Sequence, residues 1–242
     1  MAEQVYEGRD LEVLADMPNY HSWIMSWFSR HVRGRVVEYG AGTGTFSQYL
    51  RPLAQNLILV EPSLNLHPVL RERFPGDASV VIEAMTLEQH VQQTGTAAID
   101  TAVLVNVLEH IEDDTNALAE LSRIVRPGGH VLIFVPALAF LMSKLDRLLG
   151  HFRRYHRAEL TQKLNAAGLD VLSCCYFDSP GILPWLLVNK LLGSTSFSPA
   201  LVKLYDLAAV PVARRAEALI TPPLGKNLVA IGRCGGDVPE SG

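Results

Sequence analysis

Short apolar runs alternate with amphipathic stretches through the first half of the chain, in a strand-then-helix order that few folds accommodate. The runs are rich in Val and Ile and apolar on both faces, as buried parallel strands are. They are Arg35–Tyr39, Leu57–Glu61, Ser79–Glu83, Ile99–Val105 and His130–Pro136. Alternation of this kind predicts a parallel sheet with helices on both faces.

The segments between these runs carry the apolar spacing of helices. We predict helices over Phe46–Ala54, Leu64–Phe74, Leu87–Gln93 and Asp113–Val125. The last of them has a single apolar stripe and is followed by Pro127-Gly128-Gly129, a run that ends helices.

The second half of the chain is predicted to add two helices and two strands. The helices are expected over Leu138–Leu149 and Arg157–Ala167, and the strands over Leu169–Phe177 and Asn227–Cys234. The segment Ser179–Pro223 is too long for a loop, so we expect it to hold two or three helices.

Together these patterns predict one α/β domain over residues 1–242. It is expected to be Rossmann-like, with a seven-stranded, mostly parallel sheet, helices on both faces and a helical lid insert before the last strand. Its expected parts are an N-terminal helical lid (1–34), a cofactor-binding core (35–136), an acceptor-side half (137–178 and 224–234) and the helical insert (179–223). We expect the tail 235–242 to be disordered.

Composition limits the class of protein. A chain that is 48% hydrophobic and 19% charged is far from the disordered class, and a net charge of −4 argues against a broad nucleic-acid surface. The 3 cysteines cannot form a disulfide framework and fit a reducing compartment. The N-terminus lacks the pattern of a signal peptide, and no apolar run is long enough for a membrane span. These features predict a cytoplasmic protein without stable membrane insertion.

The strongest local motif is a glycine loop at the end of the first predicted strand. Glu38 precedes Gly40, Gly42 and Gly44 in an acidic-x-G-x-G-x-G pattern, and the third glycine of a dinucleotide fingerprint is replaced by Thr45. An acid beside the loop suits a cationic amine and repels a pyrophosphate, which favours S-adenosylmethionine (SAM) over NAD.

A second acid strengthens the prediction of a nucleoside cofactor. Glu61 ends the second predicted strand, where a carboxylate can accept hydrogen bonds from both ribose hydroxyls. NAD-binding proteins share such an acid, so Glu61 alone does not discriminate between the two cofactors.

Four segments, in order, carry a resemblance to class I SAM-dependent methyltransferases: VVEYGAGTGTF, LILVEPS, AVLVNVLEHIEDD and LSRIVRPGGHVLIFVP. The chain is similar to the bacterial type 11 and type 12 groups, and a weaker likeness continues through GHFRRYHRAELTQKLNAAGLDVLSCCYF. The resemblance implies a seven-stranded sheet whose last strand is antiparallel.

The resemblance also assigns cofactor contacts. It implies that Glu38 and the three loop glycines hold the methionine amine and carboxylate, that Glu61 holds the ribose and that Pro62 lies beside the adenosine. Many relatives have an Asp after the third strand, where this chain has Ala84-Met85-Thr86. Met85 is therefore expected to pack on the adenine.

The fourth predicted strand ends at Asn106-Val107-Leu108-Glu109-His110, and Asn106 should face the sulfonium. In ubiquinone-pathway O-methyltransferases and some RNA methyltransferases a similar stretch reads E-x-x-E-H and binds a divalent metal. Asn106 replaces the first acid here, so we predict no metal. His110 is a candidate general base, or else a residue that fixes the following loop.

Further candidates follow the fifth strand and flank the sheet. We expect Arg153 and Arg154 to bind an anionic group of the substrate and His151 or Tyr155 to accept a proton; the alternative is a solvated basic helix flank. Tyr20 is a candidate for a lid over the cofactor.

The insert carries an apolar stretch around Trp185 that could line an acceptor pocket, form a homodimer contact or rest on a membrane. Its helix offers only Lys190 as a basic residue, which favours the pocket wall or the dimer over the membrane.

These observations lead to one main functional hypothesis: SAM-dependent methylation of a small or medium acceptor by in-line displacement. We expect an amphipathic or anionic acceptor and transfer to oxygen, with nitrogen and carbon open. A SAM-binding regulatory or scaffold protein without catalysis is the alternative. An NAD(P)-dependent reductase is disfavoured by Thr45 and by the lack of a Tyr-x-x-x-Lys pair.

Overall fold

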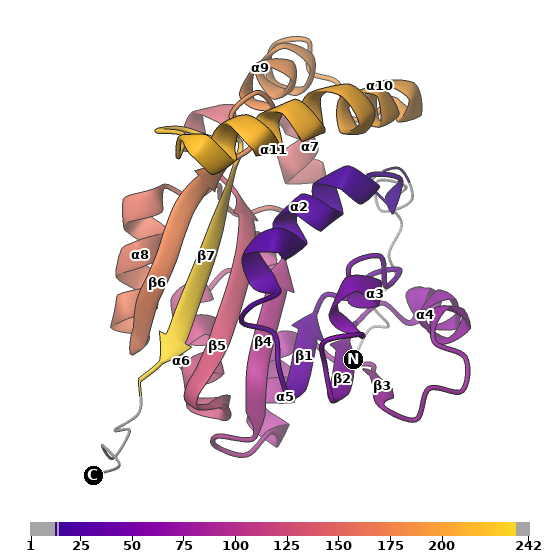
Figure 1. The fold of residues 1–242 in the computed structure, drawn as a ribbon, viewed down its shortest axis with the longest axis vertical. Helices are drawn as coiled ribbons and strands as arrows, with labels where there is room; N and C mark the ends of the chain where they lie inside the picture. Colours follow the sequence, from indigo (N-terminus) through magenta and orange to yellow (C-terminus); the bar gives the residue numbers. More distant parts are fainter. Residues whose placement is uncertain (1–12, 14, 236–242) are drawn as a thin grey trace.

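A seven-stranded sheet in the order β3-β2-β1-β4-β5-β7-β6 forms the centre of the molecule (Figure 1). The structure, a computed structural model, describes residue 13 and residues 15–235. Most of the first part of the predicted N-terminal lid, and residues 236–242 of the predicted disordered tail, lie outside them. The strands are β1 (Arg35–Tyr39), β2 (Asn56–Val60), β3 (Val80–Glu83), β4 (Ile99–Val105), β5 (Val125–Pro136), β6 (Leu169–Phe177) and β7 (Asn227–Cys234).

The strand directions place the carboxyl ends of β1 to β6 at one edge of the sheet. Strands β1 to β5 pair in parallel, whereas β7 is antiparallel to both of its neighbours. Asn227, the first residue of β7, pairs with Pro136 at the end of β5 and with Phe177 at the end of β6. The predicted Rossmann-like sheet, with its last strand antiparallel, is confirmed, and the chain enters β7 from the carboxyl edge of the other strands.

Helices cover both faces of this sheet, which explains why its strands are apolar throughout. On one face lie α5 (Leu87–Gln93), α6 (Asp114–Ile124) and α8 (Arg157–Ala166); on the other lie α2 (Pro18–Phe28), α3 (Ser47–Leu50), α4 (His67–Arg73) and α11 (Val210–Leu219). In β5, Ile133 packs into the first core and its neighbours Leu132 and Phe134 into the second. Side chains that alternate between two cores give a continuous apolar run.

Several predicted helices are shorter than their apolar patterns suggest. The helix predicted over Leu138–Leu149 is broken into η3 (Ala139–Leu141) and α7 (Lys144–Leu148). Ser143 interrupts it, because its hydroxyl accepts a hydrogen bond from the Asp146 amide at 3.2 Å and caps α7. Likewise, the stretch Leu64–Phe74 divides into η1 (Leu64–Leu66) and α4.

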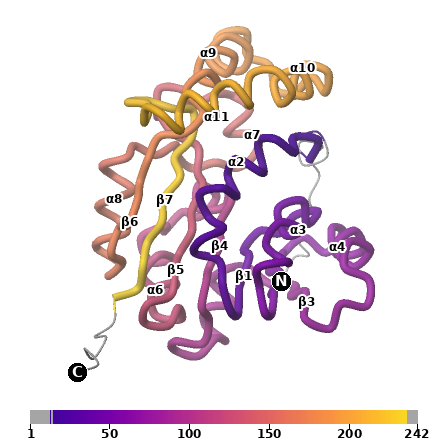
Figure 2. Tube along the Cα trace, viewed as in Figure 1, coloured from indigo at the N-terminus to yellow at the C-terminus, as the bar shows by residue number. Residues whose placement is uncertain are grey.

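The segment between β6 and β7 is helical, as predicted, and lies across the carboxyl edge of the sheet (Figures 1 and 2). It comprises α9 (Ile182–Pro184), the π-helical η4 (Trp185–Leu191), α10 (Pro199–Leu204), the π-helical η5 (Tyr205–Ala209) and α11. Both α11 and η5 pack against α2, so the insert and the N-terminal helix cover this edge together. Among the described residues, no helix is long and apolar enough to cross a bilayer.

Candidate active site

The glycine loop after β1 has the backbone geometry that its glycines allow. Gly40, Gly42 and Gly44 have φ angles of 65°, 56° and 75°, which residues with a Cβ rarely adopt. A Cβ on Gly40 would lie 2.6 Å from a methyl carbon of Val107, in the segment that follows β4. The loop and the end of β4 are therefore in close contact, and the two halves of the predicted site are neighbours.

Two buried carboxyl groups face this loop. Glu61 accepts hydrogen bonds from the amides of Gly42 and Ser63, both at 2.8 Å. Glu38 accepts one from the Ser47 hydroxyl. Burial, together with the nearby charge of Glu61, raises the pKa of Glu38 to about 8, although the hydrogen bond from Ser47 opposes the shift. A cation bound beside this pair would favour the ionised form of Glu38, so the pair fits the ammonium group of SAM.

The other residues predicted to contact the cofactor lie along the same edge. Pro62 is half-buried directly after Glu61, and Met85 is half-buried after β3. Asn106 follows β4 with a φ of 53°, and its amide donates to the carbonyl of Phe134 at 2.8 Å. These residues follow β2, β3 and β4 at the carboxyl edge of the sheet, and their contacts with a cofactor remain predictions.

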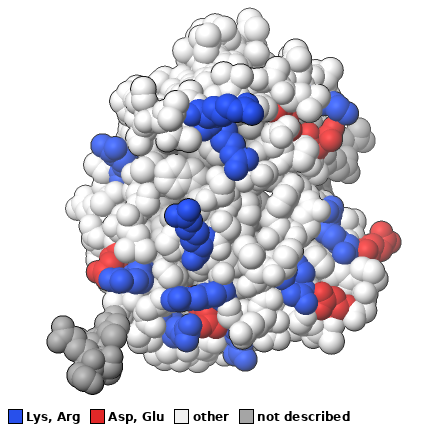
Figure 3. Space-filling view, in the orientation of Figure 1, with Lys and Arg blue, Asp and Glu red and all other residues white. Residues whose placement is uncertain are grey.

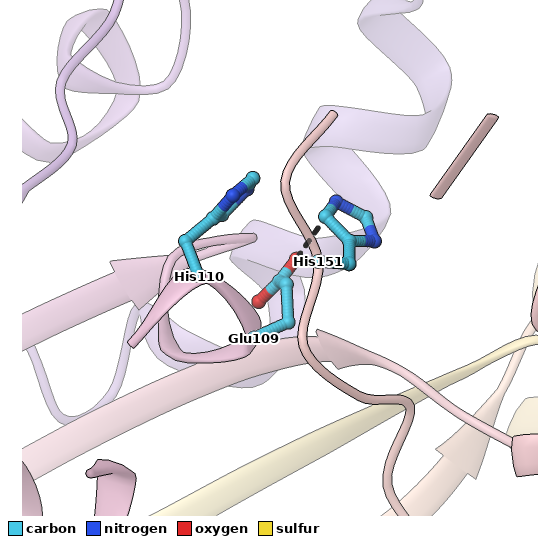
Figure 4. A group of neighbouring side chains, drawn as sticks. All are labelled: Glu109, His110 and His151. Atoms are coloured by element: carbon cyan, nitrogen blue, oxygen red, sulfur yellow. Dashed lines mark ion pairs between the residues drawn. The ribbon is translucent and has the colours of Figure 1, made fainter. Parts of the chain in front are cut away.

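A cluster of three titratable side chains lies beyond Asn106. Glu109 and His110 come from η2 (Leu108–His110), which follows β4, and His151 comes from the loop after α7 (Figure 4). The Glu109 Oε1 and the His151 Nε2 lie 4.0 Å apart, and the two imidazole rings are nearly perpendicular with centroids 4.6 Å apart. Thus the structure brings together two of the three predicted catalytic residues.

The carboxylate of Glu109 is the most unusual group in this cluster. It is fully buried, and neither of its oxygens has a hydrogen-bond partner. Burial raises its pKa to about 7, although His151 and Arg154 oppose the shift. Burying a carboxylate without a hydrogen-bond partner costs folding free energy, and carboxylates of this kind are concentrated at functional sites.

Asp146 orients the histidine of the cluster. Its Oδ1 lies 3.1 Å from the His151 Nδ1, which directs the other ring nitrogen toward Glu109. Although burial of Asp146 favours its neutral form, the contacts with His151, Arg154 and Ser143 outweigh this effect and hold its pKa below the usual range. His151 is therefore held between a firmly ionised carboxylate and a carboxylate of raised pKa.

This arrangement has two chemical capacities. One ligand atom from each of Glu109, His110 and His151 lies within 4.8 Å of the others, so the group could hold a divalent cation. Alternatively, His151 and Glu109 can take up a proton from a bound acceptor. The Nε2 of His151 faces the carboxylate of Glu109, and the pKa of that carboxylate is raised to about 7.

The two arginines predicted to bind substrate are instead occupied within the protein. Arg154 is buried, and its guanidinium pairs with Asp146 at 2.8 Å and donates to the carbonyl of Ala137 at 3.1 Å. Arg153 pairs with Asp114 at 2.9 Å and donates to the carbonyl of Ile111 at 2.9 Å. These contacts fix the loop that carries His151, and the expectation that the two arginines bind an anionic substrate group stays a prediction.

Tyr155 is also part of the interior rather than of an open site. It is fully buried, and its hydroxyl donates to Asp114 at 2.7 Å. Burial and the neighbouring charge of Asp114 raise its pKa above the usual range. The side chain ties the start of α8 to α6, and its role as a proton acceptor stays a prediction.

Tyr20 and Trp185 join the covering helices to the sheet edge. The Tyr20 hydroxyl lies 3.1 Å from a carboxylate oxygen of Asp178, and its ring packs edge-on against Phe134 and Phe177. These contacts make Tyr20 an anchor for α2, and its place in a lid over the cofactor stays a prediction. Trp185 is half-buried, its indole donating to the carbonyl of Leu141 at 3.1 Å, and its place in an acceptor pocket remains a prediction.

Sequence reasoning did not single out three acids on which the site depends: Glu109, Asp146 and Asp178. Glu109 stands where the E-x-x-E-H pattern has its second acid, next to His110, and this position is a usable signal. Ser143 and Asp146 have the spacing of a capping box. Nothing local distinguishes Asp178, whose partners Tyr20 and Tyr205 come from distant segments.

Comparison with known proteins identifies the family. The model of a methyltransferase-domain family, Methyltransf_23, matches residues 18–174. A Mycolicibacterium smegmatis protein named "Probable S-adenosylmethionine-dependent methyltransferase" is 29% identical over 158 residues, which are 60% of each chain. The chain thus spans about three fifths of the length of this relative.

Solved structures show the same fold. The N-methyltransferase NodS from Bradyrhizobium japonicum, in complex with S-adenosylhomocysteine, has a TM-score of 0.62 at 15% identity and covers 95% of this chain and 94% of its own. A Burkholderia thailandensis 1,6-didemethyltoxoflavin-N1-methyltransferase has a TM-score of 0.59 at 17% identity over 93% of this chain and 82% of its own. The glycine loop, its two acids and the match over more than half of the chain agree: the protein belongs to the class I SAM-dependent methyltransferase family.

Proposed function

We propose that this chain transfers a methyl group from SAM to an oxygen atom of a small or medium organic acceptor. The observation that carries the proposal is the buried, unpartnered carboxylate of Glu109 beside His151, on the segment that touches the glycine loop. A regulatory protein that only bound SAM would have no use for a buried proton acceptor at this place.

Different residues along the carboxyl edge would bind different parts of the cofactor. Glu38 and the loop glycines would hold its amino-acid part, Glu61 its ribose, and Pro62 and Met85 its adenosine. When bound, SAM would supply a methyl group on a positively charged sulfur, where in-line displacement is feasible. The loop Asn106–His110 would then face the methyl group.

The cluster beyond Asn106 supports oxygen as the acceptor atom. A hydroxyl must lose its proton as it is methylated, and His151 with Glu109 offers a place for that proton. Alignment and exclusion of water by the covering helices would supply most of the remaining acceleration. The two neighbours named above act on nitrogen by their titles, but at 15% and 17% identity they share the fold alone.

The acceptor is proposed to have an apolar part. Within the insert that covers the edge, Ile182, Trp185 and Leu186 are partly buried and pack against the first core. Since Arg153 and Arg154 are paired inside the protein, an anionic group is not required of the acceptor.

Binding and turnover together test this function. Isothermal titration with SAM, S-adenosylhomocysteine and NAD should show binding of the first two only. Mass spectrometry of hydroxylated metabolites incubated with the protein and SAM should show a product heavier by one methylene group. Binding of NAD without SAM would indicate a reductase, and SAM binding without turnover of any acceptor would favour the regulatory alternative.

The first variant to test is Glu109→Gln, which keeps the shape of the side chain and removes its charge. We expect kcat to fall about 10²–10⁴-fold, the usual contribution of a proton acceptor, with little change in the Kd of SAM. Glu112→Gln, an exposed acid three residues further on, is the control. A chelator should leave turnover unchanged; loss of activity with recovery on adding a divalent cation would instead assign the cluster to a metal.

A further inference from the structure

The exposed apolar side chains of the molecule are concentrated on the insert. Among the described residues, 20 large apolar side chains are exposed, and more than half of them lie in residues 179–223. They are Leu183, Leu187, Val188, Leu191, Leu192, Leu201, Leu204, Leu207, Val212, Leu219 and Ile220. Isolated exposed leucines are ordinary, but a concentration of this kind marks an interaction surface.

The helical run from α10 to α11 shows that this exposure is one-sided. Asp206, Val210 and Ala213 are buried, and the latter two pack into the core that contains α2. At helical spacing, Leu204 and Val212 lie on the opposite side of the run and are exposed. The run is therefore unusual for a helix on a protein surface, because the charged Asp206 is on the side that faces the protein and leucines are on the side that faces out.

Charge on the insert is equally one-sided. Lys190, Lys203 and Arg215 are exposed, whereas Asp206 is buried and Glu217 accepts two hydrogen bonds from Ser179 at 2.8 Å. In Figure 3 the upper part of the molecule, which the insert forms, is largely white, with blue side chains and a smaller red group beside them.

One acid lies near these basic groups. Asp16 faces Lys203 at 3.8 Å, and both side chains are more than half exposed, so their pairing is weak. The insert thus presents a positive, apolar surface on a chain whose net charge is −4.

The sequence of the first insert helix, with Lys190 as its only basic residue, argues against a membrane, but the structure adds the exposed Lys203 and Arg215 of the α10–α11 run. With them, the combination of charge and apolar surface favours a lipid surface over a second copy of the chain. In a symmetric dimer the same patch meets itself, so Lys190, Lys203 and Arg215 would face like charges with no exposed insert acid to pair with. An anionic bilayer accepts both properties at once, since aliphatic side chains enter the acyl region and cations remain at the headgroups.

We propose that the insert docks the protein onto anionic membranes through the leucines of η4 and of the α10–α11 run, with Lys190, Lys203 and Arg215 at the headgroups. The insert covers the carboxyl edge that carries Glu109 and His151, so docking would place the site beside the bilayer. The proposal concerns binding to a surface and stands whether or not the chain transfers methyl groups.

Vesicle sedimentation of the full chain tests this proposal. We expect binding to vesicles of phosphatidylcholine mixed with phosphatidylglycerol, much weaker binding to phosphatidylcholine alone, and loss of binding at high salt. The double variant Leu191→Gln/Leu192→Gln should reduce the partition coefficient by about tenfold or more, because the second of these side chains is 81% exposed and free to enter the bilayer. Lys203→Gln/Arg215→Gln should reduce it on the mixed vesicles only.

The matched control is Leu53→Gln, an exposed leucine just before β2, at the opposite edge of the sheet, which should leave binding unchanged. Circular dichroism and thermal unfolding establish that each variant is folded. Failure of the wild-type chain to bind the mixed vesicles overturns the proposal. So does a dimer in analytical ultracentrifugation that the leucine variants dissociate, because the patch would then belong to a second copy.

Discussion

At the scale of single residues, burial raises the pKa values of two carboxyl groups toward neutral pH, and we propose a different role for each of them. Burial raises the pKa of Glu38 to about 8 and that of Glu109 to about 7. Glu38 has a hydroxyl donor in Ser47 and lies at the cofactor loop, whereas Glu109 has no donor and lies beside His151. The first is suited to meet a cation and the second to receive a proton.

The raised pKa of Glu38 predicts a pH-dependent effect on stability. The folded state holds this proton more firmly than the unfolded state, whose pKa is near 4.5, so the free energy of unfolding should fall as pH rises from about 5 to about 8. The variant Glu38→Gln lacks this contribution and should gain about 1 kcal/mol per pH unit relative to wild type over that range. Urea unfolding at several pH values measures the difference; a constant difference would contradict the assignment.

The same variant should weaken the binding of the cofactor. Removing the charge of Glu38 should raise the Kd of SAM by roughly 10–100-fold, the usual cost of losing a hydrogen bond to a charged group. Titration calorimetry measures this change, and Glu72→Gln on the exposed side of α4 is the control. A Kd that is unchanged would remove Glu38 from the cofactor site.

At the scale of elements, the loop between α7 and α8 behaves as a rigid support. Arg154 and Asp146 form a buried ion pair, Arg153 holds Asp114, and Tyr155 donates to the same aspartate. The sequence shows a basic segment, and its high density of charge suggests a substrate site. The aspartates that pair with its arginines lie elsewhere in the chain or are not marked by it, and for that reason the sequence does not reveal that Arg154 is buried and that Arg153 is already paired.

This support predicts an unequal effect of two neighbouring substitutions. Arg154→Met should lower the free energy of unfolding by about 3–5 kcal/mol, because it leaves Asp146 buried without its cation. Arg153→Met should cost about 1 kcal/mol or less, since its side chain is more exposed and Lys163 still pairs with Asp114 at 2.6 Å. Urea unfolding of both variants checks the ranking. Equal costs, with a raised KM for the acceptor, would return the pair to the substrate site.

At the scale of the whole molecule, the sheet follows from the sequence and the covering layer does not. Each strand is marked by a local apolar run. All seven strands end within one residue of the predicted position, and six also begin within one residue of it, while β5 begins five residues earlier than predicted. The glycine loop and its acids are also local signals. The insert is different: its helices are predicted by length, but its buried side is set by Asp206 meeting Asn19 and Tyr20, nearly two hundred positions away.

The contact between the insert and α2 predicts that the two segments open together. Asp206 accepts hydrogen bonds from the amide of Tyr20 at 2.8 Å and from that of Asn19 at 3.2 Å. Asp206→Asn places an amide group among these donors and should raise hydrogen exchange in both α2 and α11 by about 10–100-fold. Exchange in β4 and β5 should stay as in wild type. A rise confined to one helix would show that the two segments are independent.

The antiparallel entry of β7 has a consequence for how this protein can vary. Two adjacent antiparallel strands need only a tight hairpin between them, so the sheet places no demand on the length of the connection from Phe177 to Asn227. Relatives can therefore exchange this segment for another without rebuilding the cofactor half. Any exchange must respect the contact of Asp206 with Asn19 and Tyr20, and we expect substitutions at these positions to occur together among closely related chains.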